Sequence, residues 1–151
     1  MKLNLTILLV LSSLLFASCD IGGYGKKVKV SDQTEIFIKN DATEDDAKKL
    51  GTFFDTTWKE QTNKKSFQLS KDSGNYTVRM VVNEDKIKAD TTLNISFQAI
   101  QFLIEQQVFK GNKVTLILTD NKFKDIMTVK SSPSLFNGEQ APTNDSTNVD
   151  K

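Results

Sequence analysis

Short stretches of alternating apolar and polar residues predict β-strands along most of the chain. In residues 34–39, Ile36 and Ile38 share one face while Glu35 and Lys39 share the other, which is the period of a half-buried strand. The predicted strands are residues 28–30, which extend or pair with the first strand, 34–39, 66–70, 76–82, 114–118 and 123–129. Turn residues at 71–75 predict a β-hairpin, and residues 120–121 predict a second tight turn.

Two stretches with apolar residues at helical spacing lie between the predicted strands. The first predicts an amphipathic helix from about Asp41 to Trp58, with acidic residues 44–46 in the first turn, where the helix dipole favours them. The second begins near Asp90 or Thr91, after a charged loop at residues 83–90, and ends at Gly111. Its broad apolar stripe predicts that it is the more buried helix. The stripe consists of Leu93, Phe97, Ile100, Ile104 and Val108, widened by Ala99 and Leu103.

The element order is βαββαβ with an additional final strand. It predicts an α+β two-layer sandwich, in which an antiparallel sheet of four to five strands carries both helices on one face, as in ferredoxin-like and related folds. On this register the uncovered face presents a candidate binding face of Phe37, Arg79, Val81 and Ile117. Alternatively, the last strand, residues 135–136 or a second copy of the chain covers this face.

Composition changes at both ends of the predicted domain, residues 26–130. Residues 19–25 contain three of the seven glycines and predict a flexible tether. Residues 131–151 contain both prolines and few large apolar side chains, which predicts a disordered polar tail. Leu135 and Phe136 are the exception in the tail, and they form either a clip onto the domain or a small docking motif.

The N-terminus has the layout of an export signal. Lys2 precedes about a dozen mostly apolar residues, 5–16, a stretch shorter than the ~20 residues of a transmembrane helix. The small residues Ala17 and Ser18 then precede Cys19, the only cysteine of the chain. These residues alone also fit an ordinary secreted protein that is cut near Ala17 or Ser18, or a membrane anchor that is retained.

These residues resemble the precursor of a bacterial lipoprotein, whose lipobox ends in a cysteine. The resemblance covers residues 1–20 and implies that residues 1–18 are a signal peptide removed by the lipoprotein signal peptidase. It further implies that the Cys19 sulfur carries a diacylglycerol and that the new amino group can be acylated, for example with palmitate. The expected location is the bacterial cell envelope on the periplasmic side or surface, anchored to a membrane whose leaflet the sequence does not identify.

Composition excludes the common catalytic chemistries. The chain has no His, one Cys, and 20 basic against 19 acidic residues, for a formal charge of +1. Imidazole catalysis, most transition-metal sites and a nucleic-acid electrostatic footprint are therefore excluded. The chain also has no Ser-x-x-Lys pattern and no glycine-rich phosphate loop. We expect neither a metal nor a cofactor.

The remaining function classes are binding functions. The favoured hypothesis is a non-enzymatic envelope module with a protein or glycan partner. A small-molecule or peptide sensor or inhibitor domain is the main rival, and a hydrolase is the least favoured. Neighbouring lysines at 48–49 and 64–65 are close enough to a membrane to touch anionic lipids, although acidic neighbours favour ordinary surface charge. Trp58 is expected at the edge of the core rather than in a binding site.

Overall fold

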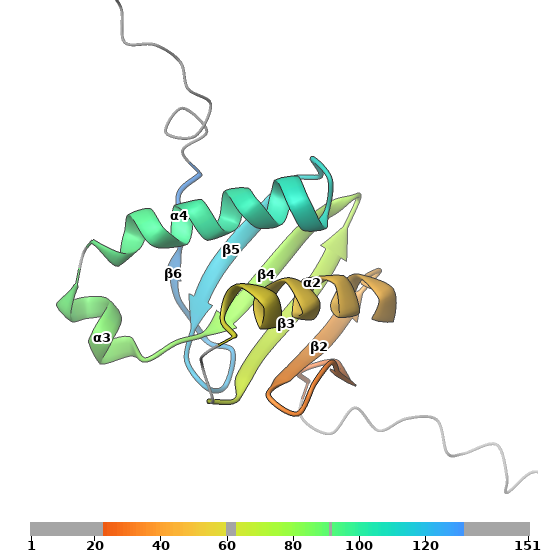
Figure 1. Ribbon diagram of the computed structural model, residues 1–151, viewed down its shortest axis with the longest axis horizontal. Helices are drawn as coiled ribbons and strands as arrows, with labels where there is room; N and C mark the ends of the chain where they lie inside the picture. Colours follow the sequence, from red (N-terminus) through yellow and green to blue (C-terminus); the bar gives the residue numbers. More distant parts are fainter. Residues whose placement is uncertain (1–22, 60–62, 91, 132–151) are drawn as a thin grey trace, which may run out of the picture.

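A computed structural model describes residues 23–59, 63–90 and 92–131 (Figure 1). These residues form one six-stranded sheet, with helices between the strands. The elements are β1 (Lys26–Lys29), β2 (Thr34–Asn40), α2 (Glu44–Thr57), β3 (Lys65–Asp72), β4 (Asn75–Val81), α3 (Glu84–Ala89), α4 (Leu93–Leu103), its π-helical continuation η2 (Ile104–Val108), β5 (Val114–Thr119) and β6 (Asp125–Thr128). The predicted signal peptide, Cys19 and nearly all of the predicted tail lie outside the described residues.

The strands lie in the sheet in the same order as in the chain. The pairs β2–β3 and β4–β5 are parallel, and the other neighbouring pairs are antiparallel. The predicted α+β class is confirmed, but the prediction of an antiparallel sheet of four to five strands is wrong. Each helical connection joins adjacent parallel strands, which a crossover of this length allows, instead of leaving room for another strand between them.

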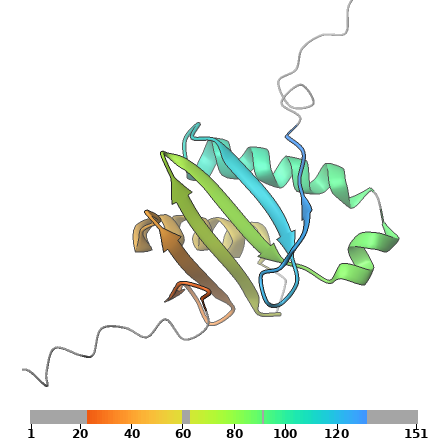
Figure 2. The same ribbon diagram turned by 180° about the vertical axis from the view of Figure 1, so that it is seen from behind.

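The helices α2 and α4 cover the same face of the sheet, as the two opposite views show (Figures 1 and 2). The β2–β3 pair runs opposite to the β4–β5 pair, because β3 and β4 are antiparallel. Both crossovers, from β2 to β3 and from β4 to β5, move one strand further in the same direction across the sheet, and both pass over the same face. Because they start from strands that run in opposite directions, the two crossovers have opposite hand. One of the two crossovers is therefore left-handed. Only about 2% of connections between parallel strands of one sheet have this hand.

The core lies between this face of the sheet and the helices. Phe54 of α2 stacks on Phe67 of β3 with ring centroids 4.2 Å apart, and Trp58 stacks on Phe54 at 4.8 Å. Trp58 thus packs at the edge of the core. The largest fully buried apolar side chains are Phe54, Phe67, Ile36, Leu50, Leu69, Ile104, Leu116, Leu118, Val78 and Val114.

The helix starts differ from the predicted ones because of local capping. The helix α2 begins at Glu44, not near Asp41, since Thr43 is its N-cap: the Thr43 hydroxyl accepts from the Asp46 N–H, and the Asp46 carboxylate accepts from the Thr43 N–H. The predicted charged loop at 83–90 contains the short helix α3, whose N-cap Asn83 accepts from the N–H of Lys86.

The helix α4 is rotated relative to the predicted stripe. The prediction that it is the more buried helix is wrong, because α2 has five buried residues and α4 with η2 has four. The buried residues of α4 are Phe97, Gln98 and Gln101, so two glutamines take inward positions. The reason lies in β5, where the Leu116 N–H donates to Gln101 Oε1 at 3.3 Å. A buried backbone donor without a strand partner requires such an acceptor.

Candidate binding groove

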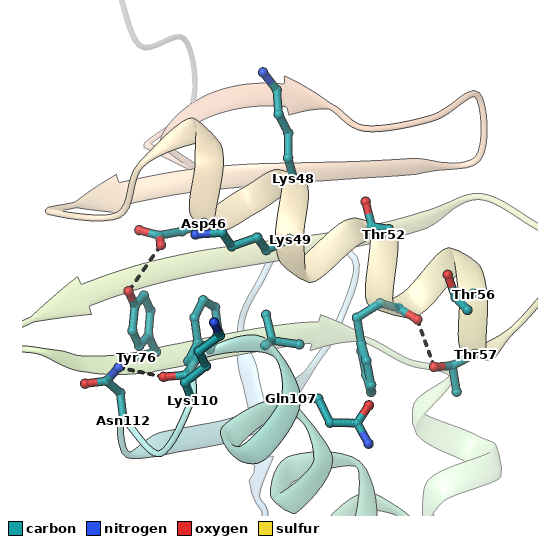
Figure 3. A pocket seen from close by; sticks show the side chains of 13 residues that line it. Asp46, Lys48, Lys49, Thr52, Thr56, Thr57, Tyr76, Gln107, Lys110 and Asn112 are labelled. Atoms are coloured by element: carbon teal, nitrogen blue, oxygen red, sulfur yellow. Dashed lines mark hydrogen bonds between the residues drawn. The ribbon is translucent and has the colours of Figure 1, made fainter.

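An open groove of about 830 Å³ lies on the helix side of the molecule, between α2 and η2 (Figure 3). Residues of α2 form one wall, η2 and the turn after it form the other, and Tyr76 of β4 lies at one end. We call this feature the helix groove. It is lined by Asp46, Lys48, Lys49, Thr52, Phe53, Thr56, Thr57, Tyr76, Gln107, Val108, Phe109, Lys110 and Asn112.

The middle of the helix groove is apolar. Phe53 and Phe54 are adjacent in α2, so their side chains leave the helix about 100° apart; Phe54 enters the core while Phe53 lies half-buried on the flank. The Thr57 hydroxyl donates to the Phe53 carbonyl at 2.8 Å. Across the groove, Val108 is half-buried at the end of η2. Two partly exposed apolar side chains therefore face the space between the helices.

The wider turn of η2 shapes the other end of the groove. The Phe109 N–H donates to the Ile104 carbonyl at 3.1 Å, a π-helical i→i+5 bond. Phe109 stacks on Tyr76 with centroids 3.7 Å apart. The Tyr76 hydroxyl donates to Asp46 Oδ1 at 3.2 Å, and both side chains are at least 90% buried. Because Asp46 also caps α2, its carboxylate is already engaged in structural hydrogen bonds.

Lysines surround this polar end. Lys49 pairs with Asp45 at 2.6 Å, and the hydrogen bond raises the pKa of Lys49. The ammonium of Lys71 lies 5.0 Å from the Tyr76 ring centroid, and its interaction with the Tyr76 side chain raises the pKa of Lys71. Lys110 is exposed on the turn after η2, whereas Lys48 extends away from Tyr76 in Figure 3. The groove thus combines an apolar middle with a cationic end.

The four predicted site residues lie on the opposite face of the sheet. Phe37, Arg79 and Ile117 occupy one row of the register, with Gln68 between Phe37 and Arg79. The predicted orientation of their side chains is thus confirmed. Ile117 is only 7% exposed, Phe37 and Val81 are half-buried, and the guanidinium of Arg79 pairs with Asp125 at 2.8 Å. A binding role for this face stays a prediction.

Part of that face is covered by the chain's own residues. Tyr24 and Phe123 each pack edge-to-face against Phe37, with centroids 6.1 and 5.5 Å away. The Tyr24 carbonyl accepts from Gln68 Nε2 at 2.9 Å. Residues 23–25, which the sequence places in the flexible tether, therefore belong to the packed part of the chain.

Gly25 allows this close approach. Its φ is +98°, and a Cβ at this position would lie 2.3 Å from the Ile38 carbonyl oxygen. Only glycine fits there without a shift of the backbone. The N-terminal segment therefore lies against the sheet at a position where any side chain would force the backbone to shift.

Sequence reasoning missed the helix groove. Its walls, around Phe53 and Val108, are far apart in the sequence and meet only after both crossovers have formed. The adjacent phenylalanines of α2 were the available signal, because only one of the two can enter the core. Within the described ranges, no group of three or more His, Cys, Asp or Glu side chains could hold a metal ion. None of the helices described there has the length and apolarity that crossing a bilayer requires.

Comparison with known proteins identifies one family. A family model described as the AF_1994_N family N-terminal domain matches residues 27–131, well over half of the chain. No curated protein and no solved structure gives a significant match. The chain therefore belongs to the AF_1994_N family.

Proposed function

We propose that the protein is a lipid-anchored, non-enzymatic binding module of the bacterial cell envelope, and that a peptide segment of a partner protein binds in the helix groove. The observation that carries the proposal is the groove itself, whose apolar middle and cationic end match a peptide with an apolar side chain next to a carboxylate. Apolar walls with a few placed polar groups are typical of binding sites.

The chemistry of the groove supports binding rather than catalysis. The chain has no His, and the Asp46 carboxylate in the groove accepts from Tyr76 and from the backbone of Thr43. General bases are most often His, Asp or Glu side chains within hydrogen-bond reach of the substrate. Lys49 remains cationic at neutral pH, because its pKa is raised, not lowered.

A second candidate is binding of a small anionic molecule. The groove volume of about 830 Å³ falls within the usual range of small-molecule pockets, roughly 300 to 1,000 Å³. The same lysines would hold its anionic group. The two candidates differ in the mass of what is bound.

Photo-crosslinking in cells tests both candidates. A photoreactive amino acid at position 107, which is exposed on the groove wall, should give a covalent adduct, and the same group at exposed Ile95 on α4 should not. An adduct of protein mass supports the peptide proposal, and an adduct of a few hundred daltons supports the small molecule.

Charge variants make the test specific. Lys49→Gln combined with Lys110→Gln should reduce the adduct strongly. Lys59→Gln with Lys86→Gln removes the same charge from two exposed lysines outside the groove and should leave the adduct unchanged. Absence of an adduct at position 107, or equal effects of the two double variants, would overturn the proposed site.

A further inference from the structure

A second hollow, of about 630 Å³, lies on the sheet face opposite the helices. It is formed where the N-terminal segment enters the domain and where the loop between β5 and β6 bends over the sheet. The residues that matter for its chemistry are Gly23, Tyr24, Lys39, Lys122, Phe123 and Lys124. We call it the sheet hollow.

The few residues between Gly23 and Cys19 limit the distance between the sheet hollow and the predicted lipid anchor. The Gly23 carbonyl accepts from Lys39 Nζ at 3.0 Å, so Gly23 is held at the hollow. Cys19 precedes Gly23 by four residues, and four residues span at most about 14 Å. A lipid on Cys19 therefore keeps the sheet hollow within that distance of the head-group layer.

The sheet hollow is cationic. Lys39, Lys122 and Lys124 are exposed, and none of the three forms a salt bridge within the part of the chain that the structure describes. The lining acid, Asp125, is paired with Arg79. Lys122 and Lys124, together with the donors of the Lys39 ammonium that its bond to the Gly23 carbonyl leaves over, are thus available to an anionic surface that comes within a Debye length, about 8 Å at physiological salt.

The loop that carries two of these lysines is held in place. The Asp120 carboxylate accepts from the backbone N–H groups of Lys124 and Lys122, at 2.9 and 2.8 Å. These bonds lower the pKa of Asp120, so its carboxylate stays ionised and keeps the loop closed. The lysine side chains are therefore presented from a preformed turn.

Aromatic rings border the lysines. Tyr24 and Phe123 pack edge-to-face with centroids 5.5 Å apart, and both are half-buried. Tyrosine, whose ring is apolar and whose hydroxyl is polar, and lysine are typical of protein surfaces at the level of lipid head groups, and Phe123 adds apolar area beside them.

We propose that the sheet hollow docks onto the anionic phospholipid head groups of the membrane that holds the anchor, so that the helix groove on the other side of the sheet faces away from the membrane. This inference rests on the proposed lipid anchor at Cys19. Each lysine near an anionic surface strengthens association by about fivefold at most. Three lysines orient an anchored domain but do not replace the anchor.

Tryptophan fluorescence can measure this orientation. The lipidated chain is reconstituted into phosphatidylcholine vesicles that contain a brominated lipid, with or without phosphatidylglycerol. The natural chain has one tryptophan, Trp58, which packs on α2 at the helix side. The variant Trp58→Phe with Asn121→Trp moves the reporter to the exposed turn next to Lys122.

The reporter on the turn should be quenched in vesicles with phosphatidylglycerol, and Trp58 of the natural chain should not. Adding Lys122→Gln and Lys124→Gln, or high salt, should abolish the quenching. Lys59→Gln with Lys86→Gln should not. Quenching no stronger than that of Trp58, or quenching that persists without Lys122 and Lys124, would overturn the inference.

Failure of the anchor would be visible separately. Mass spectrometry of the same preparation shows whether Cys19 carries lipid. If Cys19 is unmodified, its thiol, the only one in the chain, is coupled to a maleimide phospholipid and the fluorescence measurement is repeated. The quenching then decides the orientation independently of natural lipidation.

Discussion

Gly25 is the residue on which the placement of the N-terminal segment depends. Gly25→Ala should lower the free energy of unfolding by at least about 2 kcal/mol, because left-handed backbone strain adds to a clash with the Ile38 carbonyl. Gly74→Ala is the matched control, since Gly74 has φ +82° but nothing within 4 Å of an added Cβ. This variant should lose only the free energy that the left-handed backbone costs, about 1 to 2 kcal/mol. Equal losses in urea unfolding would contradict the proposed close contact.

Asp55 joins the end of α2 to two strands. Its carboxylate accepts from the Thr34 hydroxyl and from Lys65 Nζ, at 3.3 Å for the latter. Burial raises the pKa of Asp55, but hydrogen bonds from Thr34, Ser31 and Lys65 outweigh it, so the net pKa lies below its ordinary value. The Lys65 side chain is only 8% exposed, and removing the carboxylate would leave its charge poorly compensated.

Asp55→Asn should therefore destabilise the protein by about 1 to 3 kcal/mol at neutral pH. Since the folded-state pKa is lowered, the stabilisation is complete above the unfolded value of about 3.9 and is lost as the pH falls through the folded value. The difference from the natural chain in urea midpoints should shrink in acid. Asp32→Asn, in an exposed pair with Lys29, should change stability by under about 0.5 kcal/mol. A pH-independent effect of Asp55→Asn would contradict this assignment.

At the scale of elements, α4 and η2 protect the part of β5 that β6 does not cover. Pairing with β6 starts at Ile117, and the two N–H groups before it turn to the helix: Leu116 donates to Gln101 Oε1 and Val114 to Glu105 Oε2. Gln101 and Glu105 are about one turn apart along the helix, and Leu116 and Val114 are two residues apart along the strand. The distance between the two acceptors therefore matches the distance between the two donors. A helix thus takes the place of an edge strand.

Gln101→Leu should lower the free energy of unfolding by about 1 to 3 kcal/mol, because it leaves the buried Leu116 N–H without its acceptor. Amide exchange at Leu116 should become faster. Gln106→Leu changes an exposed glutamine of the same helix and should affect neither measurement. Unchanged exchange at Leu116 in Gln101→Leu would show that the edge is protected in another way.

The elements themselves were largely predictable, but their arrangement was not. Alternation placed Phe67 and Leu69 on the same face as Met80 and Val78, and the register confirms these pairs. Parallel and antiparallel neighbours share the same alternation, so the pattern could not distinguish the two kinds of sheet. The inward position of Gln101 depends on a strand edge that exists only in the folded molecule, which no helical periodicity reveals.

At the scale of the whole molecule, the two surfaces proposed to bind lie on opposite sides of one sheet. The helix groove involves Tyr76, on the covered face of β4, whereas the sheet hollow involves Arg79, on the other face of the same strand. A domain that contacts the membrane through one surface thus leaves the other accessible to a partner. The candidate face predicted from sequence overlaps the sheet hollow at Arg79.

The lipid anchor itself is the prediction that links these surfaces to a location. The mature protein should begin at Cys19, lack residues 1–18 and carry the added mass of a diacylglycerol. Mass spectrometry of the N-terminal peptide from the membrane fraction checks this outcome. A Cys19 of unmodified mass, or Cys19→Ser protein that stays in the membrane, would contradict it.

The strand order of the sheet equals the order of the strands in the chain, so the sheet can form from one edge to the other as the chain folds. Each strand pairs with the strand that precedes it in the sequence, so no strand has to be inserted between two strands that are already paired. In a split βαβ arrangement, by contrast, neighbouring positions stay open until later strands arrive. If the chain is exported as residues 1–20 predict, it can therefore add each strand to a sheet already begun as it emerges from its N-terminus onward, with no edge kept open for a segment that has yet to cross.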